Sequence, residues 1–424
     1  MDKNKFIKRA ILRPLEDHLK KKEITLIVGP RQAGKTTLMN KLKEFLEKNN
    51  AKILFLNLDF ENDKKYFVSQ SDLIDKINLE FGKSKGYVFI DEIQRKEDAG
   101  LFLKGIYDKN LLCKFIVSGS GSLELKEKIH ESLAGRKMMF EVKPISFSEF
   151  VNYKTDYKYE SKLNDFFNIE KDEAEKFLKE YMNFGGYPRV ILEDTFSDKA
   201  RIIDEIYRSY LERDASYLLR IEKIDAFDSL VKLLASQTGK ILNYSKISNT
   251  LNISLQTVKN YLWYLGKTFI LEKVSPYFKN IRKEIIKSPI VYFYDLGLRN
   301  YSLGLFGELR TPDSLGFSFQ NFVFNVLVEK RAFSGAKINF WRTLDKAEVD
   351  FIYSWGEKII PIEVKYANFK KPILQRSLRS FIDKYNPKTA LVVTKNFKAQ
   401  IDHHKTKIQF LPFWELIVNQ SLFL

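Results

Sequence analysis

The chain has 424 residues, of which 44% are hydrophobic and 14% aromatic. A chain of this length is too long to fold around a single hydrophobic core, so we expect two to four domains. The single cysteine, Cys113, excludes an internal disulfide and a thiolate zinc site. The four histidines show no metal-ligand spacing, and the adjacent His403 and His404 are expected to be solvated. No run reaches the roughly 18 apolar residues of a membrane span. With no apolar signal segment after Met1, we expect a cytoplasmic protein away from membranes.

The formal net charge of +17 is concentrated in two segments. Residues 239–290 carry nine Lys/Arg against two acids, and residues 365–409 carry eleven against two. Their net charges of +7 and +9 account for nearly all of the total. Local basic patches indicate a polyanion partner, and we expect nucleic acid, with DNA as the first candidate. The alternative is a solvated basic face that has no partner.

The first informative element is an apolar strand, residues 24–28, which runs through a glycine-containing loop into a helical pattern. The loop reads G-x-x-x-x-G-K-T, and backbone N–H groups of such a loop bind phosphate together with the helix N-terminus. We expect Lys35 on the β- and γ-phosphates and the Thr36 hydroxyl on Mg²⁺. ATP and Mg²⁺ are therefore the expected cofactors. The residues expected to bind the nucleotide here are Gly29, Pro30, Arg31, Gln32, Ala33, Gly34, Lys35, Thr36 and Thr37.

A second apolar strand, residues 87–90, ends in two acids, as required for hydrolysis at the carboxyl edge of an α/β sheet. Asp91 is expected in the Mg²⁺ shell, and Glu92 is expected to polarise the attacking water. The alternative is that the two acids only cap a helix. A third apolar strand, residues 115–117, leads into Ser118, which is either a sensor of the γ-phosphate or part of a turn.

Residues 244–251 and 255–265 predict two short helices joined by a turn, with Ser254 as the N-cap of the second. Two predicted strands, residues 269–274 and 290–293, follow around a basic loop. This order is typical of a winged helix. Winged helices contact DNA or serve as structural connectors, and both roles stay open. The side chains expected to contact nucleic acid are Gln256, Lys259, Asn260, Arg282 and Lys283.

Residues 346–353 and 358–365 predict a hairpin that brings Asp350 against Glu363. Lys365 shares a face with Glu363, because alternate residues of a strand point the same way. Two carboxylates suit Mg²⁺, and Lys365 could orient or help deprotonate a water bound to the metal. The spacing is that of PD-(D/E)xK nucleases. The alternative is an ordinary surface hairpin.

Together these motifs resemble the prokaryotic P-loop ATPases of AAA-related type that carry a C-terminal DUF4143 region. Further boxes extend the resemblance along almost the whole chain, at residues 132–136, 144–150, 184–188, 293–298, 348–351 and 362–365. The resemblance implies an ATPase core, a helical lid, a winged helix and a restriction-endonuclease-like end. One departure is Gln320, which stands where the family usually has a glutamate that supports the nuclease-like site. This departure weakens the expectation of metal binding and cleavage there.

Two residues gain roles only from the resemblance. Arg136 stands where a related ATPase presents an arginine finger, in cis or in trans, and a finger in trans requires a homo-oligomer. The alternative is an ordinary salt-bridged arginine. Pro188 belongs to a turn that resembles the one covering the adenine in related nucleotide switches, although a proline that starts a helix explains it nearly as well.

We therefore expect an α/β fold in four parts. These are an AAA+-like parallel-sheet ATPase domain at 1–152, a helical lid at 153–235, a winged helix at 236–295 and a nuclease-like α/β domain at 296–424. Three functions remain open from the sequence. They are an ATPase switch or motor acting on or regulated by nucleic acid, an ATP-gated metal-dependent nuclease, and a signalling or scaffold ATPase whose inactive nuclease fold binds DNA or a protein.

Overall fold

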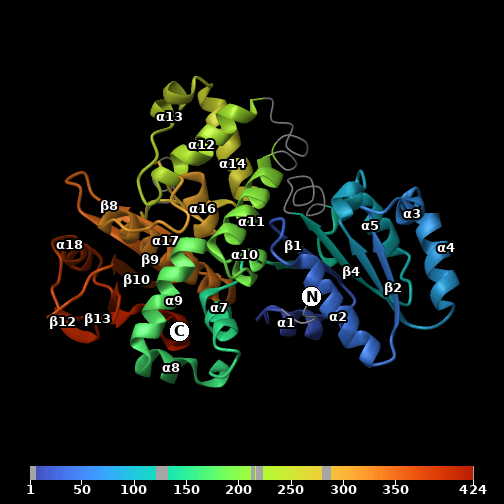
Figure 1. Cartoon of the computed structure of the whole chain (residues 1–424), viewed down its shortest axis with the longest axis horizontal. Helices are drawn as coiled ribbons and strands as arrows, with labels where there is room; N and C mark the ends of the chain where they lie inside the picture. The colour runs from blue at the N-terminus through green and yellow to red at the C-terminus, as the bar shows by residue number, and fades with distance from the viewer. Residues whose placement is uncertain (1–5, 121–131, 212–214, 216–222, 279–287, 424) are drawn as a thin grey trace.

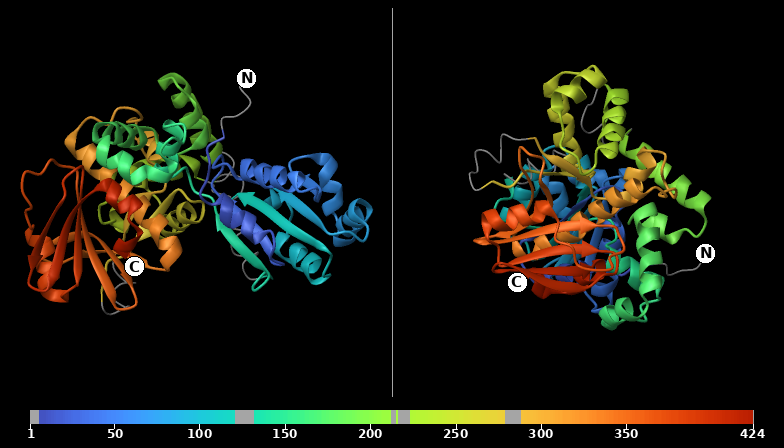
Figure 2. Two further views of the ribbon diagram at one scale, coloured as in Figure 1. Left: turned by 90° about the horizontal axis from the view of Figure 1, so that it is seen from below. Right: turned by 90° about the vertical axis from the view of Figure 1, so that its left-hand side faces the viewer.

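The computed structural model describes residues 6–120, 132–211, 215, 223–278 and 288–423. A five-stranded sheet lies at one end of the long axis and a six-stranded sheet at the other, with helices between and above them (Figures 1 and 2). In the part of the chain described, no helix combines the length and apolarity needed to cross a membrane.

The N-terminal sheet is parallel, with strand order β2-β3-β4-β1-β5. Its central strands are continuous apolar runs because helices cover both faces. Helices α1 and α2 pack on one face, and α4 and α5 pack on the other. This arrangement confirms the predicted parallel α/β domain. The elements are Leu12–His18 (α1), Ile24–Gly29 (β1), Lys35–Lys48 (α2), Lys52–Asn57 (β2), Glu61–Lys64 (α3), Gln70–Phe81 (α4), Gly86–Asp91 (β3), Ala99–Asp108 (α5), Cys113–Ser120 (β4) and Lys137–Glu141 (β5).

The next helices belong to the core of the C-terminal half of the chain. They are Phe147–Lys154 (α7), Leu163–Ile169 (α8) and Lys171–Phe184 (α9). The Phe147 ring centroid lies 5.3 Å from that of Phe322 and 5.8 Å from that of Phe413. One apolar cluster thus joins α7–α9 to elements of the C-terminal half of the chain that are distant in sequence.

Three further helices pack instead with the predicted winged helix in a second cluster. They are Pro188–Leu192 (α10), Phe196–Ser209 (α11) and Ile224–Ser236 (α12). The segment expected as one lid, residues 153–235, therefore contributes to two cores. The four-part division of the chain stays a prediction.

The predicted helix–turn–helix and its two strands are present. They are Tyr244–Leu251 (α13), Leu255–Lys267 (α14), Leu271–Val274 (β6) and Ile290–Phe293 (β7), with β6 and β7 antiparallel. Ser254 caps α14 by accepting a hydrogen bond from the Thr257 N–H at 3.0 Å. The basic loop between the strands, with Arg282 and Lys283, lies outside the described residues. Helix α16, Leu296–Ser302, follows β7.

The C-terminal sheet is mixed, with strand order β12-β13-β11-β10-β9-β8. Helix α17 covers one face, in the core shared with α7–α9, and α18 covers the other. This separate domain confirms the predicted second α/β unit. Its elements are Pro312–Ser334 (α17), Lys337–Arg342 (β8), Glu348–Trp355 (β9), Lys358–Lys365 (β10), Arg376–Tyr385 (α18), Thr389–Thr394 (β11), Ala399–His403 (β12), Thr406–Pro412 (β13) and Phe413–Val418 (α19).

Candidate functional site

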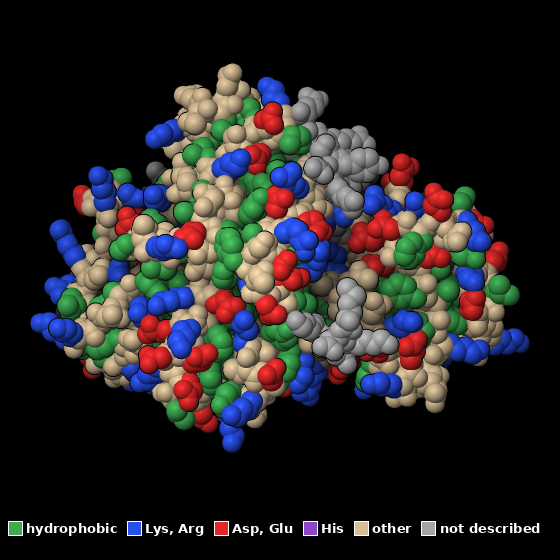
Figure 3. Space-filling view, in the orientation of Figure 1, with side chains coloured by type: hydrophobic (Ala, Val, Ile, Leu, Met, Phe, Trp, Pro, Cys, Tyr) green, Lys and Arg blue, Asp and Glu red, His purple; other side chains and the backbone are tan. Residues whose placement is uncertain are grey.

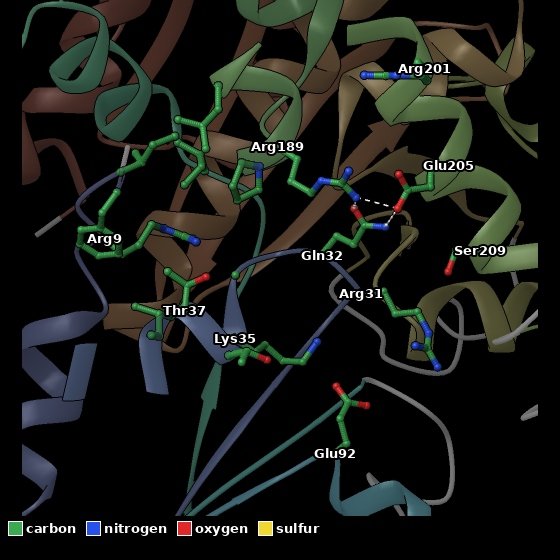
Figure 4. A pocket seen from close by; sticks show the side chains of 18 of the residues that line it. Arg9, Arg31, Gln32, Lys35, Thr37, Glu92, Arg189, Arg201, Glu205 and Ser209 are labelled. Atoms are coloured by element: carbon green, nitrogen blue, oxygen red, sulfur yellow. Dashed lines mark hydrogen bonds and ion pairs between the residues drawn. The ribbon is translucent and has the colours of Figure 1, made fainter. Parts of the chain in front are cut away.

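A cavity of about 960 Å³ lies between the carboxyl edge of the five-stranded sheet and helices α10 and α11 (Figure 4). The loop between β1 and α2 forms one wall, together with Glu92 at the end of β3. The N-terminal segment closes a side with Arg9, and α10 and α11 form the opposite wall. The strand, loop and acid that the sequence assigned to a nucleotide therefore open into one cavity.

Two glycines shape the phosphate loop. A Cβ atom on Gly29 would lie 2.1 Å from the Val142 carbonyl oxygen, so only glycine lets the chain after β5 approach so closely. Gly34 has a φ of +94°, a left-handed conformation that side chains disfavour. At the start of α2, the Lys35 Nζ donates to the Gly29 and Pro30 carbonyl oxygens at 3.1 and 2.8 Å. These contacts hold the ammonium over the loop that the sequence predicts to bind phosphate.

Asp91 is buried and joins two of the predicted site residues. The Thr36 hydroxyl donates to its Oδ2 at 2.8 Å, and the Ser118 hydroxyl donates to its Oδ1. A Mg²⁺ ion with ligand bonds of about 2.1 Å places neighbouring ligand oxygens roughly 3 Å apart. The pair formed by Thr36 Oγ1 and Asp91 Oδ2 fits that spacing. Ser118, whose role the sequence left open, is a direct partner of the carboxylate.

Glu92 faces Lys35 across the cavity (Figure 4). Its backbone is left-handed, with φ of 57°, which turns the side chain away from the strand direction after β3. The Gln94 amide donates to its carboxylate. Burial raises the pKa of Glu92, and the nearby Lys35 ammonium partly opposes that rise. A carboxylate with a raised pKa near a phosphate site has the properties expected of a general base.

Arg9 has no role predicted from the sequence, yet its side chain supports the phosphate loop. It donates to the Ala33 carbonyl oxygen at 3.1 Å and forms an ion pair with Glu149 at 3.1 Å. Glu149 also caps α7, in a capping box with Ser146, and accepts from the Ala10 N–H at 2.7 Å. Since this pair is almost fully buried, it links the phosphate loop firmly to α7 and so to the C-terminal core.

Helices α10 and α11 supply charged side chains that the sequence analysis missed. Arg189 donates to Glu205 Oε1 at 2.6 Å and to Gln32 Oε1 at 3.0 Å, which connects the phosphate loop to α11 across the cavity (Figure 4). A signal was present in the sequence, because four charged residues recur at positions i, i+3, i+4 and i+7 of one helix. They are Arg201, Asp204, Glu205 and Arg208, and all four line the cavity.

Pro188 also lines the cavity. A Cβ atom on Gly34 would lie 3.8 Å from its Cγ, so the proline lies over the phosphate loop. Pro188 is at the same time the first residue of α10, where proline is favoured. Its position is compatible with both interpretations made from the sequence, and an adenine contact stays a prediction.

Arg136 lies away from this cavity. Its carbonyl oxygen accepts from the N–H of Ile24, at the start of β1, whereas the phosphate loop follows the end of that strand. Its guanidinium binds Asp108 at 2.8 and 3.4 Å. Within one chain this geometry favours the salt-bridged interpretation over a finger in cis. A finger that acts on a partner subunit stays a prediction.

The predicted hairpin brings the nuclease-like residues together. Phe351 of β9 pairs with Ile362 of β10, so Asp350 stands opposite Glu363. Asp350 Oδ1 accepts from the Gln320 amide at 2.7 Å, and its Oδ2 accepts from the Val364 N–H at 2.7 Å. Burial raises the pKa of Asp350 to about 7. Each oxygen of this carboxyl accepts one hydrogen bond, and the Gln320 amide supplies an N–H donor where a glutamate would supply a further oxygen ligand, which opposes Mg²⁺ binding at this site.

Lys365 pairs with Glu363 at 2.9 Å. Burial alone would lower the pKa of Lys365, but the carboxylates of Glu363 and Asp350 outweigh burial and raise it. The side chain is therefore held as an ammonium. A charged lysine can orient a water or a phosphate but does not act as a base.

The predicted nucleic-acid contacts on α14 are exposed. Gln256, Lys259 and Asn260 share one face, where the Gln256 amide donates to Asn260 Oδ1 at 2.9 Å. Lys and Arg side chains also gather along the edge that holds α18 and β12 (Figure 3). Contact with nucleic acid stays a prediction for both surfaces.

Three families match consecutive parts of the chain. An AAA domain matches residues 21–151, the domain of unknown function DUF8612 matches 175–309, and DUF4143 matches 315–416. A Methanocaldococcus jannaschii uncharacterized protein is 27% identical over 96% of this chain and 91% of its own length. A Haemophilus influenzae uncharacterized protein is 26% identical over 93% of this chain and 94% of its own length.

Solved structures with similar folds include the Aeropyrum pernix ORC1 protein in complex with DNA. It is 14% identical, with a TM-score of 0.31 over 69% of this chain and 91% of that one. AMPPCP-bound DnaA from Aquifex aeolicus is 13% identical, with a TM-score of 0.29 over 62% of this chain and 90% of that one. The family matches confirm the resemblance predicted from the sequence: the chain combines an AAA-type P-loop ATPase domain with a C-terminal DUF4143 domain.

Proposed function

We propose that the chain binds ATP with Mg²⁺ in the cavity between the phosphate loop and α11, hydrolyses it, and acts on or is regulated by nucleic acid. The observation that carries the ATPase half is the convergence of Lys35, Glu92 and the Thr36–Asp91 pair on one cavity. A loop that only bound nucleotide, without hydrolysing it, would not need the buried Asp91 hydrogen-bonded to Thr36 or the second acid, Glu92, facing Lys35.

The loop N–H groups and Lys35 would hold the triphosphate, with the ammonium exchanging carbonyl oxygens for phosphate oxygens. Thr36 and Asp91 would hold Mg²⁺, which supplies positive charge to the β- and γ-phosphate oxygens. Glu92 would accept a hydrogen bond from the attacking water and so polarise it, while the Gln94 amide fixes the position of the carboxylate. Arg189 would hold Gln32 of the loop and Glu205 of α11 together beside the bound nucleotide.

Lys35→Ala tests the binding half of this proposal. A fluorescent ATP analogue should bind wild type saturably, and the variant should lose affinity at least about tenfold because a phosphate charge loses its counter-charge. Lys43→Ala is the matched control, since Lys43 lies on the same helix and pairs with Glu47 outside the cavity. Equal affinity of wild type and Lys35→Ala would contradict the proposed site.

The nucleic-acid half rests on charge and exposure. The two basic segments hold +16 of the net charge, and the α14 side chains named above face solvent. Labelled single- and double-stranded DNA and RNA, each with and without ATP, should reveal a preferred ligand. The absence of binding to all four at low salt would leave the third class, a scaffold ATPase that binds protein.

A metal-dependent nuclease is the second candidate. The presence of Asp350, Glu363 and Lys365 on one hairpin favours it, and Gln320 on Asp350 opposes it. Gln320→Glu restores the carboxylate usual in the family and should tighten Mn²⁺ binding if the site is a metal site. Asp350→Ala should then abolish cleavage of labelled DNA and leave ATP turnover unchanged. No Mn²⁺ bound by either wild type or Gln320→Glu would rule out the nuclease and leave a fold kept for binding.

A further inference from the structure

We propose that Asp383, His403 and His404 form a surface binding site for a divalent transition-metal ion such as Zn²⁺. Across the described parts of the chain, this is the one group of three potential ligand side chains whose ligand atoms all lie within 4.8 Å of one another. It lies in the C-terminal domain, far in sequence from the ATP site, and needs neither ATP nor the nuclease-like residues. From the sequence alone, the two histidines are expected only to be solvated.

The fold brings together side chains whose sequence spacing did not suggest a site. Neighbouring residues of an extended strand point to opposite faces. His403 ends β12, but His404 has a left-handed φ of 52° in the turn before β13. That turn brings the second ring back beside the first, with centroids 4.2 Å apart. Both rings then face Asp383, which lies near the end of α18.

The distances are those of a ligand set. The Nε2 atoms of His403 and His404 lie 2.8 and 3.4 Å from the same Asp383 oxygen, Oδ1. Tetrahedral Zn²⁺ with bonds of about 2.0–2.1 Å separates neighbouring ligand atoms by roughly 3.3 Å. The His404 distance already matches, and the His403 contact has to lengthen by about half an ångström. Exposed side chains at a hairpin and a helix end can make that adjustment.

The donor types select the metal. Two imidazoles with one carboxylate suit Zn²⁺, Ni²⁺ or Cu²⁺, whereas Mg²⁺ prefers oxygen ligands alone. Three protein ligands leave a coordination position for water. Bound metal would tie α18 to the β12–β13 hairpin, and β12 is an edge strand of the sheet. It would also add positive charge to the basic segment 365–409, which strengthens that surface for a polyanion.

The test is calorimetric titration of tag-free full-length protein with Zn²⁺ in excess Mg²⁺, which saturates oxygen-only sites. His404→Ala and Asp383→Asn should each weaken the binding at least about tenfold, the scale on which metal sites respond to altered ligation. Asp402→Asn is the matched control, because Asp402 precedes His403 and is an exposed acid outside the three-residue group. It should bind Zn²⁺ as wild type does.

A second readout guards against indirect effects. Co²⁺ in place of Zn²⁺ should give the intense visible d–d bands of tetrahedral Co²⁺ in wild type and Asp402→Asn, and only the weak absorption of hydrated Co²⁺ in His404→Ala. Circular dichroism should show all four proteins folded, since the substituted side chains are exposed. Failure of wild type to bind Zn²⁺, or equal affinity of wild type and His404→Ala, overturns the proposal and leaves the ATPase proposal untouched.

Discussion

At the scale of single residues, the proposed ATP site depends on how Asp91 and Glu92 are each held. Asp91 is buried between two hydroxyl donors, which suits a fixed ligand. Glu92 has one amide donor and a raised pKa, which suits a group that exchanges a proton with water. The two adjacent acids therefore have different environments, and different roles follow from them.

Glu92→Gln should leave ATP affinity within about threefold of wild type and reduce kcat by about 10²-fold or more, the scale of losing a general base. Phosphate release at saturating ATP measures the rate. Glu97→Gln, which changes an exposed acid a few residues along, should retain the wild-type rate. Wild-type turnover in Glu92→Gln would show that another group activates the water.

At the scale of elements, the cavity is closed by contacts between α10–α11 and the phosphate loop. Arg189 strengthens this connection, because it binds Gln32 of the loop and Glu205 of α11 at once, and the Gln32 amide also donates to Glu205 at 3.3 Å. The ion pair is about half exposed, so we expect it to contribute little to the stability of the fold. Its proposed role is to fix the position of α10 and α11 relative to the loop that would bind the nucleotide.

Arg189→Ala should raise the KM for ATP by about tenfold with a smaller change in kcat, because the loop then keeps only the longer Gln32–Glu205 contact with α11, at 3.3 Å, while Lys35 and Glu92 stay in place. Steady-state phosphate release gives both constants. Lys232→Ala removes a comparable exposed ion pair, with Asp228 on α12, and should change neither. If the two variants are indistinguishable, the bridge across the cavity has no role in nucleotide binding.

Helix α17 carries a buried titratable side chain, Glu329, close to Glu149 of α7. Burial, together with the nearby Glu149 carboxylate, raises the pKa of Glu329 from 4.5 to about 8. The folded chain therefore holds this proton at pH values where the unfolded chain has released it. Stability from this group is fully present below about pH 4.5 and is lost as the pH rises through 8.

Glu329→Gln keeps the shape of the neutral acid and removes its titration. The Tm of the variant should equal that of wild type near pH 4 and exceed it by about 2 °C or more near pH 8.5. Glu357→Gln, an exposed acid in the turn between β9 and β10, should follow wild type at both pH values. A Glu329→Gln Tm that tracks wild type at both values would contradict the raised pKa.

At the scale of the whole molecule, a buried link joins the ATP site to the C-terminal core. Arg9 holds both the phosphate loop and Glu149, and Glu149 caps α7, whose Phe147 packs against Phe322 and Phe413. A change around the nucleotide therefore has a packed route to the domain with the second basic segment.

If α14 contacts DNA, affinity for duplex DNA should fall steeply with salt, because each neutralised phosphate releases a counterion. Lys259→Ala should flatten the slope of log K against log salt by about one unit. Lys176→Ala, an exposed lysine on α9, is the control and should keep the wild-type slope. An unchanged slope in a folded Lys259→Ala protein assigns the winged helix to a connector role.

The sequence alone determined the parts of this protein whose geometry is local. The phosphate loop and the acids after β3 each lie within one strand and its adjacent turn, and the Asp350–Glu363 hairpin consists of two consecutive strands and the turn between them, so residue types and spacing fix the backbone in all three. The order of helices and strands in the winged helix follows from periodicity and capping for the same reason.

Only the tertiary structure decided which distant side chains meet. The apolar faces of α7–α9 do not reveal which elements they pack against. Hydrophobic burial is non-directional, so any apolar face of suitable shape could cover them until the whole core forms. Arg136 turning away from the cavity, Arg189 reaching Gln32, Gln320 engaging Asp350 and two histidines converging on Asp383 all depend on packing across long sequence separations. Contacts of that kind are set by shape and burial, which no local pattern of residues encodes.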